Sequence, residues 1–192
     1  PYPWYTFFFV WPIRWIPWSV LWPLWVVMGV LIFFWCARQF GSNALLLLMT
    51  IGALGTLWLG QLDLFVLLGL TLAFQSSSSW LRGLGYVLAA IKPQVSVLAA
   101  LVLLYYEWKE HRDWRVLLVP AGIMAASLLF FGWDWPLRWV ESILNEPDTY
   151  WFSEWNVAAR FPWGLVSFAL LPFLRGKRDQ VLGSLLVLAL TV

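Results

Sequence analysis

Two short polar runs interrupt a strongly apolar chain, and both contain residue types suited to binding an anionic, hydroxylated ligand. The first run is Gly-Gln-Leu-Asp, which includes Gln61 and ends at Asp63; the second is Ala-Ile-Lys-Pro-Gln, which includes Lys92 and ends at Gln94. A lysine ammonium offers a point charge to a phosphate. A carboxylate can act as a base or accept a hydrogen bond from a sugar hydroxyl. An amide both donates and accepts hydrogen bonds. We therefore expect these side chains to contribute to one polar site.

Two arginines later in the chain extend the same chemistry. The guanidinium groups of Arg138 and Arg160 suit a phosphate, because they can hold two of its oxygens through parallel hydrogen bonds. Asp63 is the candidate for a catalytic base. The alternative is that Asp63 and Lys92 form an ion pair whose only role is to join two helical hairpins. The residues by themselves leave both interpretations open.

The composition places this site in a membrane protein. The chain is 62% hydrophobic and 11% charged, with a mean hydropathy of +0.77, whereas soluble domains are about 25% charged. A net charge of +2 is too small to indicate nucleic-acid binding. Inserting a charge into the membrane costs about 2.5–3.5 kcal/mol, so Asp63 and Lys92 should face a partner, a cavity or a ligand. Many of the 17 tryptophans flank apolar runs, as at membrane interfaces.

Several other kinds of site are excluded by residue counts. Cys36 is the single cysteine, which rules out an internal disulfide, and we expect it to be a small buried hydrophobe. His111 is the single histidine and lies in the charged run 107–115, expected to be a solvated loop. The common zinc-ligand spacings are therefore absent, and no metal or cofactor is predicted. Two glycine pairs are interpreted as helix-packing residues: Gly52 with Gly55, and Gly83 with Gly85.

The predicted fold is all-α, a polytopic transmembrane helical bundle with short or broken helices at its outer face. Residues 1–18 contain four prolines and should form an interfacial segment with a short helix near 5–11, and residues 133–162 should form a long loop. Apolar runs bounded by polar or turn residues predict the helices, which cover 19–37, 44–59, 64–74, 81–91, 94–106, 116–132, 163–174 and 181–192.

Helix length places the polar runs below the membrane surface. The runs at 64–74, 81–91 and 94–106 have only 11 to 13 residues, whereas a crossing needs about 20. If their other ends lie at the cytoplasmic surface, Asp63 and Lys92 lie within the membrane. Irregular backbone at that depth must be packed in protein or line water, which predicts an outward-opening cleft.

The distribution of basic residues predicts the orientation. Loops on one side of the bundle collect eight Lys and Arg residues, whereas the other side collects Arg14, Lys92, Arg138 and Arg160. The positive-inside rule places the first set in the cytoplasm. Six of the ten acidic residues lie on the outer side with Asp63. The polar site then faces outward, with the reversed orientation as the alternative.

The two ends of the chain suggest a part of a longer protein. The chain begins with proline and ends within an apolar run, so we expect one transmembrane domain truncated at both ends. Its expected parts are an outer segment, the core helices, an outer loop and the last helices, at residues 1–18, 19–132, 133–162 and 163–192.

The order of these motifs resembles glycosyltransferase family 87, also described as DUF2029. The resembling features are a Tyr-Pro segment, a proline-rich aromatic stretch, Gly-Gln-x-Asp at a helix break, and Ala-x-Ile-Lys-Pro-Gln after a short glycine-containing helix, all within residues 1–132. The resemblance implies a GT-C-type membrane enzyme that takes a hexose, with mannose expected, from a polyprenyl phosphate sugar outside a bacterial plasma membrane. The implied acceptor is a glycolipid or glycan.

The resemblance also carries over to individual residues. Gln61 and Lys92 match the family pattern, whereas Asp63 stands where the family commonly has Asn. The resemblance places the catalytic base in a first outer loop, which lies outside these 192 residues. A transporter or flippase for a lipid-linked or anionic solute is the alternative function, because transporters also use broken helices around an outward cleft.

Overall fold

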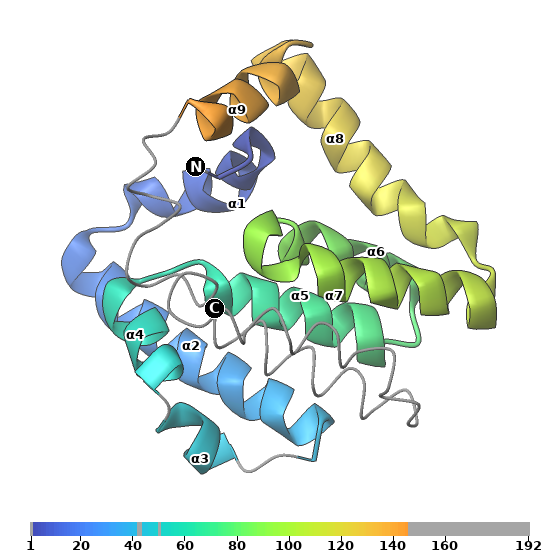
Figure 1. Ribbon diagram of the computed structural model, residues 1–192. Coiled ribbons are helices and arrows are strands. Elements are labelled where there is room, and N and C mark those ends of the chain that lie inside the picture. The colour runs from blue at the N-terminus through green and yellow to red at the C-terminus, as the bar shows by residue number, and fades with distance from the viewer. Residues whose placement is uncertain (1, 42–43, 50, 146–192) are drawn as a thin grey trace.

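A computed structural model describes residues 2–41, 44–49 and 51–145, and within them every regular element is helical (Figure 1). The chain enters through three short turns, η1 (Trp4–Thr6), α1 (Phe7–Val10) and η2 (Trp11–Trp15). Proline lacks an amide hydrogen and cannot continue one long helix, which explains the breaks around Pro12 and Pro17. The predicted short helix near residues 5–11 is confirmed.

Two helices in the described part of the chain are long and apolar enough to cross a membrane. They are α2 (Trp18–Gln39) and the continuous helical stretch Trp114–Phe131, which joins η4 (Trp114–Leu117) to α8 (Leu118–Phe131). Their ends lie within one or two residues of the predicted helices 19–37 and 116–132. Cys36 on α2 is buried, as expected for a small hydrophobe.

The predicted helix over residues 44–59 is wrong as one continuous element. The structure has α3 (Ala44–Leu48) and α4 (Ile51–Leu59) instead. Met49 forms a turn after α3, and Gly52 and Gly55 both lie within α4. Within the described residues, no atom lies within 4 Å of a Cβ added to Gly55, so no packing partner for it is seen there.

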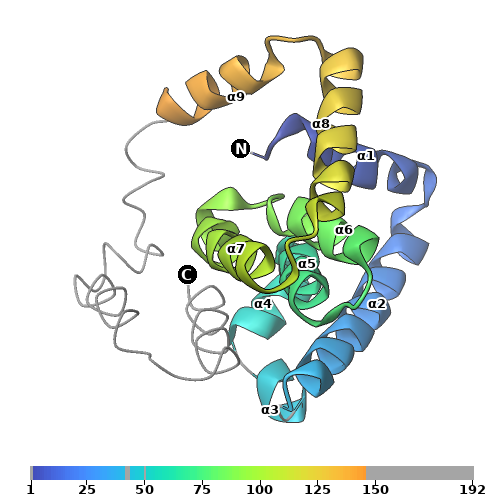
Figure 2. The same ribbon diagram turned by 90° about the vertical axis from the view of Figure 1, so that its right-hand side faces the viewer.

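The centre of the bundle is formed by α5 (Asp63–Gln75), α6 (Ser79–Ala89) and α7 (Pro93–Tyr106), which are as short as predicted. These helices lie side by side at the middle of the molecule, with α2 alongside α5 (Figures 1 and 2). A Cβ atom added to Gly69 of α5 would lie 2.6 Å from the Gly85 carbonyl oxygen of α6. The helices therefore meet backbone to backbone, which confirms the packing role of Gly85.

Two groups of buried side chains hold the bundle together. The larger group lies where α2, α5 and α7 meet, and includes Phe33, Leu64 and Leu67. The smaller group joins η1 to the end of α6 and to α9 (Trp135–Leu144), through Tyr5, Ile91 and Trp135 among others. The second group brings residues from opposite ends of the described chain to the turn that carries Lys92.

Two segments predicted as loops have more structure than expected. The first part of the predicted 133–162 loop forms α9, which lies beside the N-terminal turns (Figure 1). In the 107–115 run, α7 continues as a π-helical turn, η3 (Glu107–His111), and Glu107 is buried. The expectation of a fully solvated loop is therefore wrong at Glu107, because a cation on α6 draws it inward. The predicted helices at 163–174 and 181–192 lie outside the described residues.

Candidate functional site

The two polar runs meet in one hydrogen-bonded group, which we call the lysine end of the bundle. The ammonium Nζ of Lys92 lies 2.8 Å from Oδ1 and 2.9 Å from Oδ2 of Asp63, and it donates to Oε1 of Gln61 at 3.0 Å. The side chain of Lys92 is 12% exposed and that of Asp63 is 23% exposed. The predicted proximity of Asp63 and Lys92 is confirmed, and the pair is partly open to its surroundings.

The first polar run is a tight turn that places its side chains at the beginning of a helix. Gly60 has φ +64°, a conformation that glycine adopts without steric cost, and the amide of Gln61 donates to the Thr56 carbonyl at 3.1 Å. The chain then enters α5, so Asp63 lies in its first turn. A carboxylate is stabilised there by the positive end of the helix dipole.

The second polar run is fixed by a proline and a buried serine. Pro93 occupies the first position of α7, where its missing amide hydrogen costs nothing, and Lys92 precedes it with extended φ of −122°. The hydroxyl of Ser96 is buried and lies 2.5 Å from the carbonyl of Ala89 and 3.1 Å from that of Lys92. Ser96 therefore ties the end of α6 to the start of α7 on either side of Lys92.

Two N-terminal rings, Tyr2 and Trp4, lie between Lys92 and a second cation, Arg138, and we call them the aromatic segment. The Lys92 ammonium lies 5.9 Å from the ring centre of Tyr2, and the guanidinium carbon of Arg138 lies 5.0 Å from that of Trp4. Arg138 also pairs with Asp134 at 2.7 Å and is about half exposed. Arg138 thus borders the same aromatic segment as Lys92, but within the described residues it makes no hydrogen bond or ion pair with Lys92, Asp63 or Gln61 of the lysine end.

Two predicted site residues fall outside what the structure describes. The backbone of Gln94 lies in the first turn of α7, but its side chain is not among the described ones, and Arg160 lies outside the described residues altogether. The binding roles given to Gln94, Arg160 and the other candidates remain predictions. Within the described residues, no group of three or more His, Cys, Asp or Glu side chains is placed to hold a metal.

Sequence reasoning missed a second ionic group, at the opposite or arginine end of the central helices. Arg82 of α6 lies 2.8 Å and 3.0 Å from the two carboxylate oxygens of Glu107, and both side chains are at most 6% exposed. Arg82 also donates to the carbonyls of Ser76 and Ser77. The available signal was a lone arginine beside the glycine-containing helix, opposite an acidic residue where the next helix ends.

The arginine end also includes a third charge, on Asp113. Arg82 lies 3.8 Å from this carboxylate, and the Ser79 hydroxyl donates to it. That hydrogen bond, followed by one from the backbone amide of Arg115, holds the pKa of Asp113 below its ordinary value. The group therefore stays ionised through the physiological pH range.

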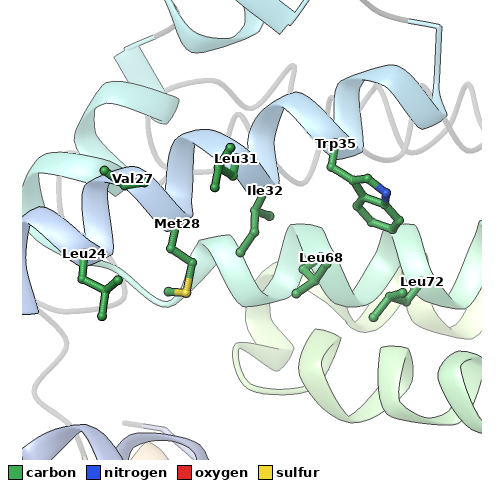
Figure 3. Close-up of a pocket in the computed structure, with 8 residues that line it drawn as sticks. All are labelled: Leu24, Val27, Met28, Leu31, Ile32, Trp35, Leu68 and Leu72. Carbon is green, nitrogen blue, oxygen red and sulfur yellow. The ribbon is translucent and has the colours of Figure 1, made fainter.

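An apolar groove of about 390 Å³ lies between α2 and α5 (Figure 3). It is open on one side, where Leu31 and Val27 are largely exposed. Its lining comes from one face of each helix: Leu24, Val27, Met28, Leu31, Ile32, Trp35, Leu68 and Leu72. Leu68 is five positions after Asp63, or about 7.5 Å along the helix axis, so the groove extends away from the lysine end.

A sequence model of glycosyltransferase family 87 matches residues 1–192. The chain belongs to glycosyltransferase family 87. The match extends over the whole sequence, beyond the motifs within residues 1–132 that carry the resemblance. Comparison with curated proteins and with solved structures gave no match.

Family 87 membership gives the polar site a chemical context. The chain is a membrane glycosyltransferase, and its reaction involves a sugar donor and an acceptor. The family is polytopic, in agreement with the two apolar helices long enough to cross a membrane.

Proposed function

We propose that this chain transfers a hexose, with mannose expected, from a polyprenyl phosphate sugar at the extracytoplasmic face of a bacterial plasma membrane. The observation that carries the proposal is the Lys92 side chain, which is 12% exposed and is held at the end of the central helices by Asp63 and Gln61. In this proposal, Lys92 contacts the phosphate of the donor. The acceptor is a glycolipid or glycan.

The chemistry of the transfer requires a cation near the leaving group. Breaking the bond between the sugar and the phosphate turns a singly charged phosphodiester into a more highly charged polyprenyl monophosphate. A preorganised positive charge that stabilises the charge developing in the transition state raises the rate. Lys92 is suited to this role because Asp63 and Gln61 already hold its ammonium group in place.

We assign Asp63 to positioning rather than to proton transfer. Both of its carboxylate oxygens contact the Lys92 ammonium, an arrangement suited to holding the cation in place. The proposal therefore places the catalytic base outside the lysine end. The apolar groove between α2 and α5 supports a lipid-borne donor, since an isoprenoid chain has the same apolar character as its lining.

Replacing Lys92 tests the assignment. In membranes that contain the full-length protein, Lys92→Met should lower transfer of radiolabelled mannose from polyprenyl phosphate mannose by roughly 100- to 1000-fold, the size of effect seen when one transition-state contact is removed. Lys92→Arg keeps the charge and should retain more activity than Lys92→Met.

Two controls separate this role from folding. Lys109 is exposed near the arginine end, so Lys109→Met makes the same chemical change and should leave transfer unchanged. The double variant Lys92→Met with Asp63→Asn leaves no unpaired carboxylate and should also be inactive. Full transfer by this double variant would show that the lysine end does not bind the donor phosphate. Uptake of the lipid without any transfer would favour the transporter alternative.

A further inference from the structure

A cluster of buried polar atoms without partners lies next to the lysine end. In the part of the chain that the structure describes, the hydroxyls of Tyr5 and Thr6 and the indole N–H of Trp135 make no hydrogen bond. Tyr5 is 7% exposed and Trp135 is 2% exposed, and their ring centres are 6.4 Å apart. A buried polar group left without a partner costs about 1–3 kcal/mol, and buried Tyr and Trp usually find one.

The position of this cluster relates it to Lys92. Tyr5 and Trp135 pack with Ile91, which precedes Lys92, and with Leu62, which precedes Asp63. Tyr2, in the same N-terminal segment, lies under the Lys92 ammonium. The unpartnered groups therefore lie close to Lys92, the residue that we propose contacts the donor phosphate.

The open side of the cluster is aromatic and has a cation at each edge. Trp4 stacks on Trp135 with ring centres 6.4 Å apart and an interplanar angle of 15°, and Arg138 lies over Trp4. Tyr2 is exposed and Trp4 is half-buried, so this side is accessible from outside the bundle. Aromatic rings offer an apolar surface for C–H groups, while the Tyr hydroxyl and Trp N–H satisfy polar ones.

We infer that the aromatic cluster of Tyr2, Trp4, Tyr5 and Trp135 is a binding subsite for the hexose ring of the donor. This inference rests on the proposed function and adds to it the residues that recognise the sugar. A hexose attached to a phosphate on Lys92 would have its C–H face on the aromatic segment. Its hydroxyl groups would pair with the unpartnered groups of Tyr5, Thr6 and Trp135. Those atoms are closed to solvent in this structure, so the rings that cover them would shift on binding.

The chemistry of the cluster favours a neutral, hydroxylated ring over an anion or a lipid chain. Burial raises the pKa of the Tyr5 phenol above its ordinary value, so the hydroxyl keeps its proton and can both donate and accept. Trp135 adds a neutral donor. An isoprenoid chain has no group that pairs with them, whereas a sugar hydroxyl pairs with both kinds.

The test compares polyprenyl phosphate with its glycosylated forms, which add a sugar and carry less negative charge. Purified full-length protein in lipid nanodiscs is titrated with polyprenyl phosphate and with its mannosyl and glucosyl forms. Because the lipids differ in charge, the affinity of each lipid is compared between wild type and variant. Tyr5→Phe and Trp135→Phe should each weaken binding of a glycosylated lipid about five- to tenfold, as for loss of one hydrogen bond, and leave polyprenyl phosphate binding unchanged. Tyr105→Phe, at a residue 61% exposed on α7, should change neither.

A second readout separates a sugar contact from a structural one. Without lipid, Tyr5→Phe removes a hydroxyl that has no partner, so the melting temperature should stay the same or rise. A lower melting temperature without lipid would mean that the hydroxyl is already satisfied, for example by buried water, and would overturn the inference. So would an equal loss of affinity for both lipids.

The same titration distinguishes the subsite from the proposed function. If wild type binds both kinds of lipid and the Tyr5→Phe and Trp135→Phe variants match it, the subsite is wrong and the proposed function stands. If wild type binds neither lipid, the proposed function is wrong and the subsite falls with it.

Discussion

At the scale of the residue, the three hydrogens of the Lys92 ammonium face three oxygen atoms, two on Asp63 and one on Gln61. An incoming phosphate must therefore replace at least one of these contacts. The carboxylate of Asp63 weakens phosphate binding, because it repels a second anion bound to the same ammonium group. The resting ion pair and the donor-binding role are thus two states of one group.

Replacing Asp63 by asparagine tests this competition. Asp63→Asn keeps an oxygen near Lys92 but removes the negative charge, so polyprenyl phosphate should bind about five- to tenfold more tightly, from roughly 1 kcal/mol of repulsion at 4 Å in water. The melting temperature without lipid should fall, since Lys92 loses its counter-ion. Glu141→Gln, at an exposed position on α9, is the control. Weaker lipid binding by Asp63→Asn would show that the carboxylate assists the phosphate.

Isolated charges were predictable from the sequence, whereas buried neutral groups were not. Asp63 and Lys92 are conspicuous because a charge in an apolar run needs a partner, and the structure supplies it. Tyr5 and Trp135 are typical of an aromatic-rich interface in the sequence. Only three-dimensional packing shows that their polar atoms lack partners.

At the scale of the element, the turn between α6 and α7 depends on Ser96. Its hydroxyl is within hydrogen-bonding distance of the carbonyls of Ala89 and Lys92, and Pro93 cannot contribute an amide hydrogen there. A single buried side chain therefore restrains the backbone that presents the lysine. This makes Ser96 a positioning residue for Lys92.

Ser96→Ala should affect donor binding through this restraint. The substitution leaves a buried carbonyl unsatisfied, at a cost of about 1–3 kcal/mol, and frees the Lys92 backbone. We expect KM for polyprenyl phosphate mannose to rise several-fold with a smaller change in kcat. Ser127→Ala removes a similarly buried hydroxyl that donates to a carbonyl on α8, so it should lower the melting temperature without changing KM. An equal KM for Ser96→Ala and Ser127→Ala would show that Ser96 does not position Lys92.

Helix boundaries were predictable where polar turns mark them and less so elsewhere. The ends of α5, α6 and α7 lie within one or two residues of the predicted ones, because Gly60, the serine run and Pro93 stop the apolar pattern. The 44–59 run has no such marker at its middle, and the α9 region has a mixed composition. In both places, packing rather than local sequence decides the outcome.

At the scale of the whole molecule, α6 and α7 form a hairpin with an ion pair at each end. Lys92 at the tip pairs with Asp63, and Arg82 pairs with Glu107 where the hairpin begins and ends. The two pairs differ in exposure: the tip is partly open, whereas Arg82 and Glu107 are closed in. We therefore expect the arginine end to stay fixed while the lysine end exchanges partners with a ligand.

Breaking the buried pair should destabilise the whole bundle. Glu107→Gln removes the nearer of the two carboxylates beside the buried Arg82 guanidinium and leaves only Asp113, at 3.8 Å, so we expect a loss of about 3 kcal/mol in the free energy of unfolding. Replacing both residues with apolar ones, as Arg82→Met with Glu107→Leu, should recover most of it. Denaturant unfolding of the full chain in detergent measures both, and Glu141→Gln at an exposed position should change it by at most about 0.5 kcal/mol. A double variant no more stable than Glu107→Gln would contradict this account.

The contact between Gly69 and Gly85 has a further consequence for how the site can change. Because the two backbones interlock there, sliding α6 along α5 by one turn would bring larger side chains into a space that holds no Cβ atom. The height of Lys92 relative to Asp63 is thus set by glycines in the middle of the helices, and not by the charges at their tips. Substitutions at the tip can therefore alter which head group is recognised while the alignment of the two helices stays as it is.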